Sequence, residues 1–275
     1  YKNNYVQSAV LVANGGVIAN YVEYSKDNDI AQIGNIKAYF SGNYVESNKN
    51  SAYGGVISNF YMKSDSYYKN AIIDSINSTF ENNYAKTKST DSTKGAFGGA
   101  IGNIAIIKSI NNSIFKNNYA MSVGGSTAAG GAIYTMQDLT INANNGGLTE
   151  FTGNYISTDG GATKNYEAIN VGTSGKTLTL NATTNGTILL NDYIFFTPNN
   201  RHIDVNTWEQ IMGKAAKAVG INRIIGTRGL RKTMGNRYYK AAKDKTAALV
   251  ELNEYFGHTN LRATMIYIGL EQEKI

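Results

Sequence analysis

The residues best suited to chemistry in this 275-residue chain lie near its C-terminal end. The segments LRKTMG, FGHTN and TMIYIG contribute Arg231, His258 and Tyr267, and the last two residues are nine positions apart. A guanidinium can bond two oxygens of a phosphate and neutralise its charge. A tyrosine oxygen can attack phosphorus and leave again, because the pKa of its phenol is ~10. A histidine can donate a hydrogen bond to the same phosphate.

Taken singly, each of these residues also has a purely structural explanation. The chain holds 20 tyrosines, so Tyr267 alone would be a packing residue. Arg231 alone would be an exposed helix arginine, and His258 alone a turn histidine bonded to backbone. The functional interpretation therefore rests on the joint occurrence of the three motifs at this spacing.

Together the three motifs resemble the C-terminal catalytic region of tyrosine recombinases, the phage integrases. The resemblance implies that Arg231 clamps the scissile phosphate, that His258 donates to it, and that Tyr267 is the nucleophile of a covalent 3′-phosphotyrosine. It also implies DNA strand cleavage and rejoining without a metal ion or any other cofactor. A multimer of recombinase subunits is the protein partner that it implies.

The match departs from the family pattern at two places. Arg228 stands at the family's histidine position, which replaces a proton-transfer group with a permanent cation. The family's second arginine and its β-hairpin lysine lie upstream of the helix that begins near Val205, where this chain has only the repeats described below. We therefore expect a truncated recombinase domain that has little or no activity alone.

The charge of the chain is concentrated beside these motifs. Residues 1–195 hold thirteen lysines, no arginine and thirteen acids, so the whole net charge of +6 belongs to the last eighty residues. A basic segment of this kind favours double-stranded DNA as the partner of residues 205–275. The candidate phosphate contacts are Lys232, Arg237, Lys240 and Arg262, beside Lys243 and Lys245. The alternative is that these cations form an ordinary solvated helix face.

Helices are the elements that must position these residues. The apolar spacing predicts a helix over 205–220, one that Thr227 caps, one from Thr246 to Phe256, and a short one from about Asn260. Gly220 and Gly257 suit the left-handed position after a helix. We expect a small all-α domain over 205–275.

The preceding part of the chain is repetitive. Four GG[VA]I segments alternate with four segments of the type YFSGNYV, and the phenylalanines Phe40, Phe80, Phe115 and Phe151 recur at intervals of 40, 35 and 36 residues. Short β-branched stretches between them predict stacked strands. We expect a right-handed parallel β-helix over 1–194, with the isoleucine of each GGxI segment pointing inward. These repeats resemble autotransporter passenger domains of the polymorphic outer-membrane protein group.

Two parts with different resemblances leave several functions open. The first is a fragment of an enzyme. The second is a surface adhesin, whose β-helix binds a host ligand and whose C-terminal tail is an accidental fusion. In the third, the tail binds DNA without catalysing a reaction. The recombinase interpretation implies the cytoplasm and the adhesin interpretation the cell surface, so no single compartment is assigned.

Zero cysteines exclude disulfides and thiolate metal sites. An isolated Asp27-x-Asp29 pair is typical of a solvated loop, so no metal site is predicted. Residues 195–204 form the expected junction.

Overall fold

The computed structural model describes residues 1–22, 30–61, 70–183, 185–191, 210, 227–242 and 244–270, except the side chains of 227, 228 and 230. The chain divides into two compact units, Tyr1–His202 and Ile203–Ile275. The division falls inside 195–204, where the change of composition puts the junction. The predicted helix over 205–220 and the pair Asp27 and Asp29 lie outside the described residues.

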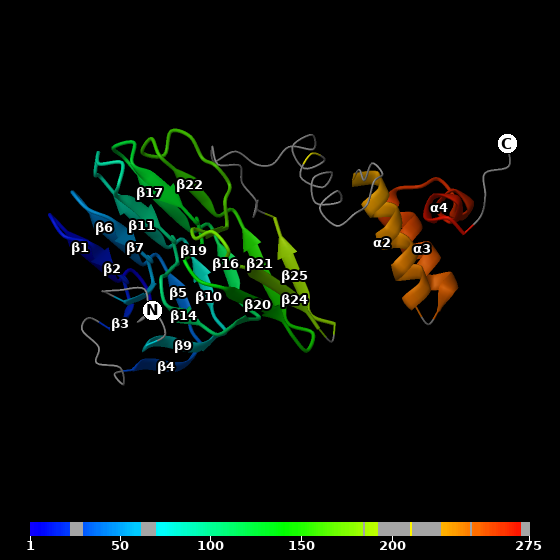
Figure 1. The fold of residues 1–275 in the computed structure, drawn as a ribbon, viewed down its shortest axis with the longest axis horizontal. Helices are drawn as coiled ribbons and strands as arrows, with labels where there is room; N and C mark the ends of the chain where they lie inside the picture. The colour runs from blue at the N-terminus through cyan, green and yellow to red at the C-terminus, as the bar shows by residue number, and fades with distance from the viewer. Residues whose placement is uncertain are drawn as a thin grey trace. The chain divides into compact units, whose positions relative to one another are not determined.

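The first unit is a parallel β-solenoid, as the repeats predict (Figure 1). The coils pass in turn through five sheets, and equivalent strands of successive coils pair in parallel. Sheet 1 contains β1 (Tyr5–Ser8), β6 (Tyr44–Ser47), β11 (Tyr84–Thr87), β17 (Tyr119–Ser122) and β22 (Tyr155–Ser157). Sheet 2 contains β2 (Ala13–Asn14), β7 (Ala52–Tyr53), β12 (Gly95–Phe97) and β18 (Thr127–Ala129). Sheet 3 contains β3 (Ile18–Val22), β8 (Ile57–Tyr61), β13 (Ile101–Asn103), β19 (Ile133–Thr135) and β23 (Ile169–Val171).

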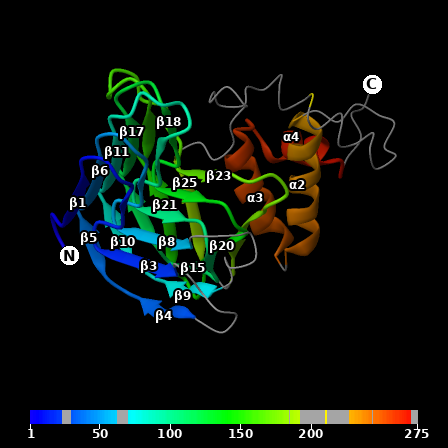
Figure 2. The same ribbon diagram turned by 60° about the vertical axis from the view of Figure 1, so that its left-hand side comes forward.

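Two further sheets close each coil. Sheet 4 contains β4 (Ala31–Ile36), β9 (Ala71–Ile76), β14 (Ile106–Ile107), β15 (Ile110–Asn111), β20 (Leu139–Ala143) and β24 (Leu178–Ala182). Sheet 5 contains β5 (Tyr39–Ser41), β10 (Thr79–Glu81), β16 (Ile114–Lys116), β21 (Leu148–Thr152) and β25 (Thr187–Leu190). Figure 2 shows β1, β6, β11 and β17 side by side along one wall of the solenoid.

The paired glycines form the tight corner between sheets 2 and 3. The first glycine of each pair is left-handed, with φ of 63° at Gly54 and 69° at Gly98. The second packs directly on the next coil, because a Cβ at Gly99 would lie 2.1 Å from the carbonyl oxygen of Gly131. The following isoleucines turn into the core: Ile57 and Ile101 are fully buried. The inward position that the sequence predicts for these isoleucines is therefore confirmed.

Aromatic rings stack through the core from coil to coil. Phe40, Phe80, Phe115 and Phe151 occupy paired positions of sheet 5, and their ring centroids lie 5.1, 4.8 and 4.8 Å apart. All four rings are fully buried. The near-constant interval of the phenylalanines in the sequence is thus the length of one coil.

Buried asparagines form a second ladder beside the phenylalanines. The side-chain Nδ2 of Asn43 donates to Oδ1 of Asn83 at 3.0 Å, and the same bond joins Asn83 to Asn118 and Asn118 to Asn154. The residue before each ladder asparagine is left-handed, as at Asn82 with φ of 56°. Glycine and asparagine are the residues that tolerate this conformation best, which explains why the position before each ladder asparagine is always one of these two.

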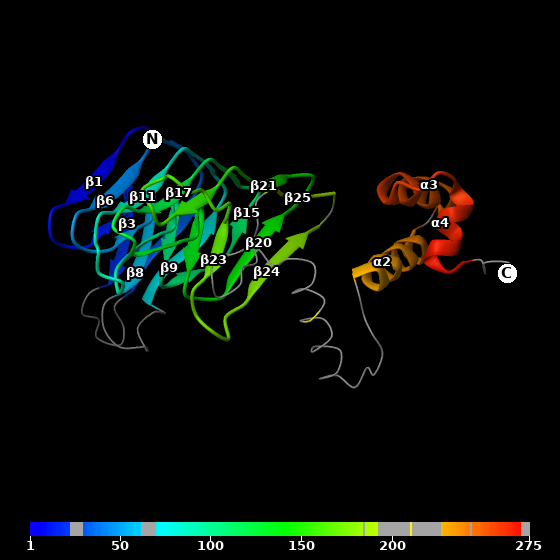
Figure 3. The ribbon, with the colours of Figure 1, turned by 90° about the horizontal axis from the view of Figure 1, so that it is seen from above.

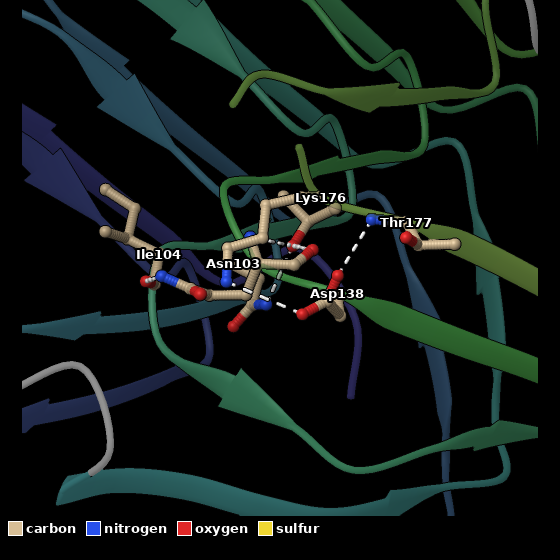
Figure 4. Close-up of polar contacts among 7 residues, drawn as sticks. Asn103, Ile104, Asp138, Lys176 and Thr177 are labelled. Carbon is tan, nitrogen blue, oxygen red and sulfur yellow. Dashed lines mark hydrogen bonds and ion pairs between the residues drawn. The ribbon is translucent and has the colours of Figure 1, made fainter. Parts of the chain in front are cut away.

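The last coil is attached to its neighbour by polar contacts at its outer edge. Figure 4 shows Asp138 between Lys176 and Thr177. The backbone nitrogen of Thr177 donates to Asp138 Oδ1 at 2.8 Å, and Lys176 Nζ lies 3.5 Å from Oδ2. The Thr177 bond lowers the pKa of the Asp138 carboxyl. Another asparagine ladder lies in sheet 3, where Asn20 donates to Asn59 and Asn59 to Asn103, each at 2.9 Å. It ends where Asn103 donates to Thr135 Oγ1 at 3.0 Å.

The described part of the second unit consists of three helices, α2 (Thr227–Ala241), α3 (Lys245–Phe256) and α4 (Leu261–Ile268), and α4 contacts both of the others (Figure 3). The start of α3 differs from the sequence prediction. The helix begins at Lys245 rather than at Thr246, and Asp244 is its N-cap, because the Asp244 carboxylate accepts from the backbone nitrogens of Thr246 and Ala247. Gly257 is left-handed with φ of 66°, as predicted.

Candidate active site in the helical unit

The ring of Phe256 lies at the centre of the three predicted active-site residues. The guanidinium carbon of Arg231 is 4.9 Å from the ring centroid, and the rings of His258 and Tyr267 are 5.4 and 5.1 Å away. The rings of His258 and Tyr267 also meet edge to face at 5.0 Å. Arg231, His258 and Tyr267, from three different segments, thus form one group around Phe256, which we call the Phe256 cluster.

Arg231 is held at the C-terminal end of α3. Its Nη2 donates to the carbonyl oxygens of Tyr255 at 3.4 Å and Phe256 at 3.0 Å. These carbonyls carry the negative end of the helix dipole, which stabilises a cation there. The guanidinium also has Nε and Nη1 as donors, so its anchored position leaves a second edge with which to bond an anion.

His258 follows the left-handed Gly257 and is held by Asn253 from both sides. The backbone nitrogen of His258 donates to the carbonyl of Asn253 at 3.1 Å, and the side-chain Nδ2 of Asn253 donates to the carbonyl of His258 at 3.1 Å. The imidazole Nδ1 lies 2.9 Å from Thr264 Oγ1. Hydrogen bonds therefore hold both the backbone of His258 and one nitrogen of its imidazole ring.

Tyr267 is positioned by the packing of the short helix α4. Asn260 caps the first turn by accepting from the nitrogen of Ala263 at 2.8 Å. Ile268 is buried at the other end, and Asn236 of α2 donates to its carbonyl at 2.8 Å. Gly235 makes this approach possible, because a Cβ there would lie 2.7 Å from the Phe256 ring and 2.8 Å from Ile268. Tyr267 is half-buried beside them.

The predicted DNA contacts are all exposed but do not share one face. Around the axis of α2, Lys240 lies about 80° and Arg237 about 140° from Lys232. Arg262 is in the first turn of α4. The backbone of Arg228 is in the first turn of α2, and its side chain lies outside the description.

Lys245 has a structural role that the sequence did not reveal. Its ammonium donates to the carbonyls of Tyr239, Lys240 and Ala242 at 2.9, 2.7 and 2.8 Å, and so it caps the C-terminal end of α2. These bonds use the three hydrogens of the ammonium, which makes Lys245 a weaker candidate for phosphate than its neighbours.

Two side chains beside His258 were also missed. Asn253 was overlooked because it lies between apolar helix positions, although asparagine is a poor helix former and its presence near a helix end is itself a signal. Thr264 belongs to the motif TMIYIG, yet only its contact with His258 shows what it does. Among the described residues, no group of three or more His, Asp or Glu side chains is arranged to hold a metal ion.

The comparisons with known proteins point to the same part of the chain. Residues 164–274 match the model of the phage integrase family. A curated relative from Bacillus subtilis (strain 168), described as "Probable integrase/recombinase YoeC", is 34% identical over 84 residues, which cover 30% of this chain and 44% of the relative. The match thus spans less than half the length of that relative. No solved structure matches the chain significantly.

The solenoid has its own family match. Residues 112–136, which include β16 to β18, match the model of the Chlamydia polymorphic membrane protein repeat. The integrase match begins at residue 164, so its first part overlaps the last coil, where β23 and β24 pair in parallel with β19 and β20. The chain therefore has two parts with different relatives, as its repeats and motifs predict. No described helix is both long and apolar enough to span a membrane.

Proposed function

We propose that the helical unit is the C-terminal part of a DNA strand-cleavage site of the tyrosine recombinase type. The observation that supports this most is the common contact of Arg231, His258 and Tyr267 with the ring of Phe256. The phage integrase match over residues 164–274 supports it independently. Double-stranded DNA is then the substrate of this unit.

The reaction is a transesterification at phosphorus. The Tyr267 oxygen forms a bond to phosphorus while the bond from phosphorus to the 5′-oxygen breaks; the phenol loses its proton and the 5′-oxygen gains one. Arg231 bonds the non-bridging oxygens and stabilises their charge, and His258 donates to the same phosphate. The 5′-hydroxyl of a partner strand reverses the step and releases Tyr267.

The chain alone lacks parts that this reaction needs. It has no arginine before Arg201, and Arg228 stands where the family has a histidine. Loss of one preorganised donor typically costs about a hundred- to a thousandfold in rate. We therefore expect the chain by itself to form almost no covalent complex.

A nicked suicide substrate tests this proposal. The chain alone should give little or no denaturation-resistant protein–DNA band. Residues 196–275 grafted behind the upstream half of a related integrase, with Arg228→His, should give the band. Tyr267→Phe in the graft should abolish it, whereas Tyr255→Phe, at an exposed tyrosine of α3, should leave it unchanged. A band that persists in the Tyr267→Phe graft would show that another residue is the nucleophile and would refute the assignment.

The solenoid supports a second candidate function, the presentation of a binding surface outside the cell. The observation that favours it is the Chlamydia polymorphic membrane protein repeat match, together with an outward row of stacked tyrosines, Tyr44, Tyr84, Tyr119 and Tyr155. If this surface binds a host ligand, Tyr84→Ser should reduce adherence of the labelled chain to cultured cells, and Tyr267→Phe should not. Equal adherence of all three chains would contradict it.

A further inference from the structure

The orientation of the Asn253 amide is determined by its two neighbours. A carbonyl oxygen can only accept, so the atom that lies 3.1 Å from the carbonyl of His258 must be the Asn253 nitrogen. The other end of the amide is then the acceptor Oδ1, which lies 2.9 Å from Thr264 Oγ1. Thr264 therefore donates its hydroxyl hydrogen to Asn253.

This donation decides how Thr264 interacts with His258. A hydroxyl has a single hydrogen. Because Thr264 donates this hydrogen to Asn253, the Thr264 oxygen can only accept at the 2.9 Å contact with Nδ1 of His258. Nδ1 of the imidazole must then carry a hydrogen.

Burial keeps the chain of bonds from Asn253 through Thr264 to His258 intact. Thr264 is fully buried, so water does not compete for its hydroxyl. The backbone of His258 is bonded to Asn253 at both its nitrogen and its oxygen, which prevents the ring from moving away. Phe256 and Tyr267 pack against the same ring.

We propose that Asn253 and Thr264 are positioning residues that hold His258 in the tautomer with hydrogen on Nδ1, so that Nε2 is its only site of proton exchange. Neutral His258 then presents Nε2 as an acceptor, and the imidazolium presents it as a donor. The use of this arrangement in strand cleavage rests on the proposed function: His258 donates to the phosphate from Nε2, and only as the imidazolium. In the neutral form, Nε2 can accept a hydroxyl or phenol hydrogen instead.

Nitrogen NMR of the full-length chain tests this directly. The chain has only two histidines, so ¹⁵N-labelled histidine gives two ring patterns, and His202→Gln identifies that of His258. Spectra are recorded at rising pH until the ring nitrogen signals no longer change, so that the neutral ring is the form observed. We expect the pattern of a protonated Nδ1 and an unprotonated Nε2.

The variants separate tautomer control from simple packing. Thr264→Val keeps the shape but removes the acceptor, so hydrogen should appear on Nε2 in part of the population. Thr264→Ser keeps the hydroxyl and should retain the wild-type pattern. Asn253→Ala leaves the Thr264 hydrogen free to donate to Nδ1, so it should also shift hydrogen to Nε2. Thr259→Val, at an exposed threonine beside His258, is the control and should change nothing.

The amide spectrum of each variant shows whether α3 and α4 remain folded. If Thr264→Val does not fold, Asn253→Ala and Thr264→Ser still decide the question, because they predict opposite patterns. An unprotonated Nδ1 in the wild type, or an unchanged pattern in folded Asn253→Ala, would overturn the proposal. No DNA is present in this measurement, so its failure is distinct from a failure to form the phosphotyrosine complex.

Discussion

Glu167 is the side chain that departs most from the pattern of its neighbours. In the preceding coils this position is the second glycine of the pair, and the backbone nitrogen of Gly131 donates to the carbonyl of Glu167. The Glu167 carboxyl is fully buried and accepts from the nitrogen of Gly130 at 2.9 Å. Burial raises its pKa to about 7, although the Gly130 bond opposes the rise. The last coil therefore contains an acid that is protonated when folded at mildly acidic pH.

A pH titration of stability tests this acid. The unfolded chain loses the proton near the ordinary value of 4.5, whereas the folded chain keeps it to about 7. The contribution of Glu167 is therefore greatest below 4.5 and declines by roughly 3 kcal/mol as the pH rises to 7. Glu167→Gln should remove this decline, as measured by urea unfolding of the β signal. A decline of the same size in the variant would contradict the assignment.

Asp159 provides the contrasting control. Bonds from the backbone and hydroxyl of Thr163 and from Ser157 lower the pKa of its carboxyl to about 2. Its contribution is present above the ordinary value of 3.8 and disappears as the pH falls toward 2. Asp159→Asn should therefore alter stability only at the acid end and leave the decline between 4.5 and 7 intact.

At the residue scale, the sequence indicated the members of the Phe256 cluster but not what holds them. Arg231, His258 and Tyr267 are recognisable from residue type and spacing. The bonds of Asn253 and Thr264 depend on how the end of α3 meets α4, and such contacts have no periodic signature. The catalytic roles of the cluster remain predictions, to be tested by the experiments above.

At the element scale, each coil of the solenoid depends on the coils on either side. The ring of Phe115 lies between those of Phe80 and Phe151, 4.8 Å from each. Removing a ring in this position therefore eliminates stacking contacts on both of its faces. The stability of a solenoid is the sum of such neighbour interfaces, so a central coil is the most sensitive place for a deletion.

Phe115→Ala should destabilise the solenoid by about 3–5 kcal/mol, because it leaves a ring-sized cavity that stacked backbones cannot close. Urea unfolding followed by circular dichroism measures the loss. Tyr5→Ala is the matched control, since Tyr5 is 59% exposed and ends its own stack. It should cost less than about 1 kcal/mol. Equal losses in the two variants would contradict the central role of the phenylalanine stack.

The elements were predicted with unequal success for a physical reason. The strands and their inward residues follow from a repeat that recurs four times, so each copy supports the others. The start of α3 was misplaced by one residue, at Thr246 instead of Lys245, because Asp and Thr are both common at helix starts and only the observed backbone selects Asp244 as the cap. The capping of α2 by Lys245 depends on the angle between two helices, which the sequence does not contain.

At the scale of the whole molecule, charge separates the two parts. All six arginines lie after residue 200, and the solenoid part has no net charge. DNA binding by the full chain should therefore depend on cations of the helical unit and fall steeply with salt. The division of the chain into two unlike parts could be predicted from the sequence, because the repeat ends and the arginines begin within a few residues of each other.

Paired charge variants test this separation. Lys232→Gln with Lys240→Gln in the full chain should weaken duplex binding and reduce the slope of log affinity against log salt by about 2, since each lost phosphate contact removes about 0.9. Lys37→Gln with Lys49→Gln makes the same charge change at exposed positions of the solenoid. This control should leave the slope unchanged. An equal effect of both pairs on the slope, in fluorescence anisotropy, would refute binding through α2.

The common register of the coils also has an evolutionary consequence. Phe40, Phe80 and Phe115 pair directly, and so do Tyr44, Tyr84 and Tyr119, so any coil presents the same surface to its successor. An in-frame loss of residues 80–114 would bring Phe115 onto Phe40 and Asn118 onto Asn43. Unequal crossing-over between such similar segments of a gene would yield a shorter or longer solenoid in which the newly adjacent coils still pair in the same register. The length of this protein is thus a trait that can vary by whole coils without a new fold having to arise.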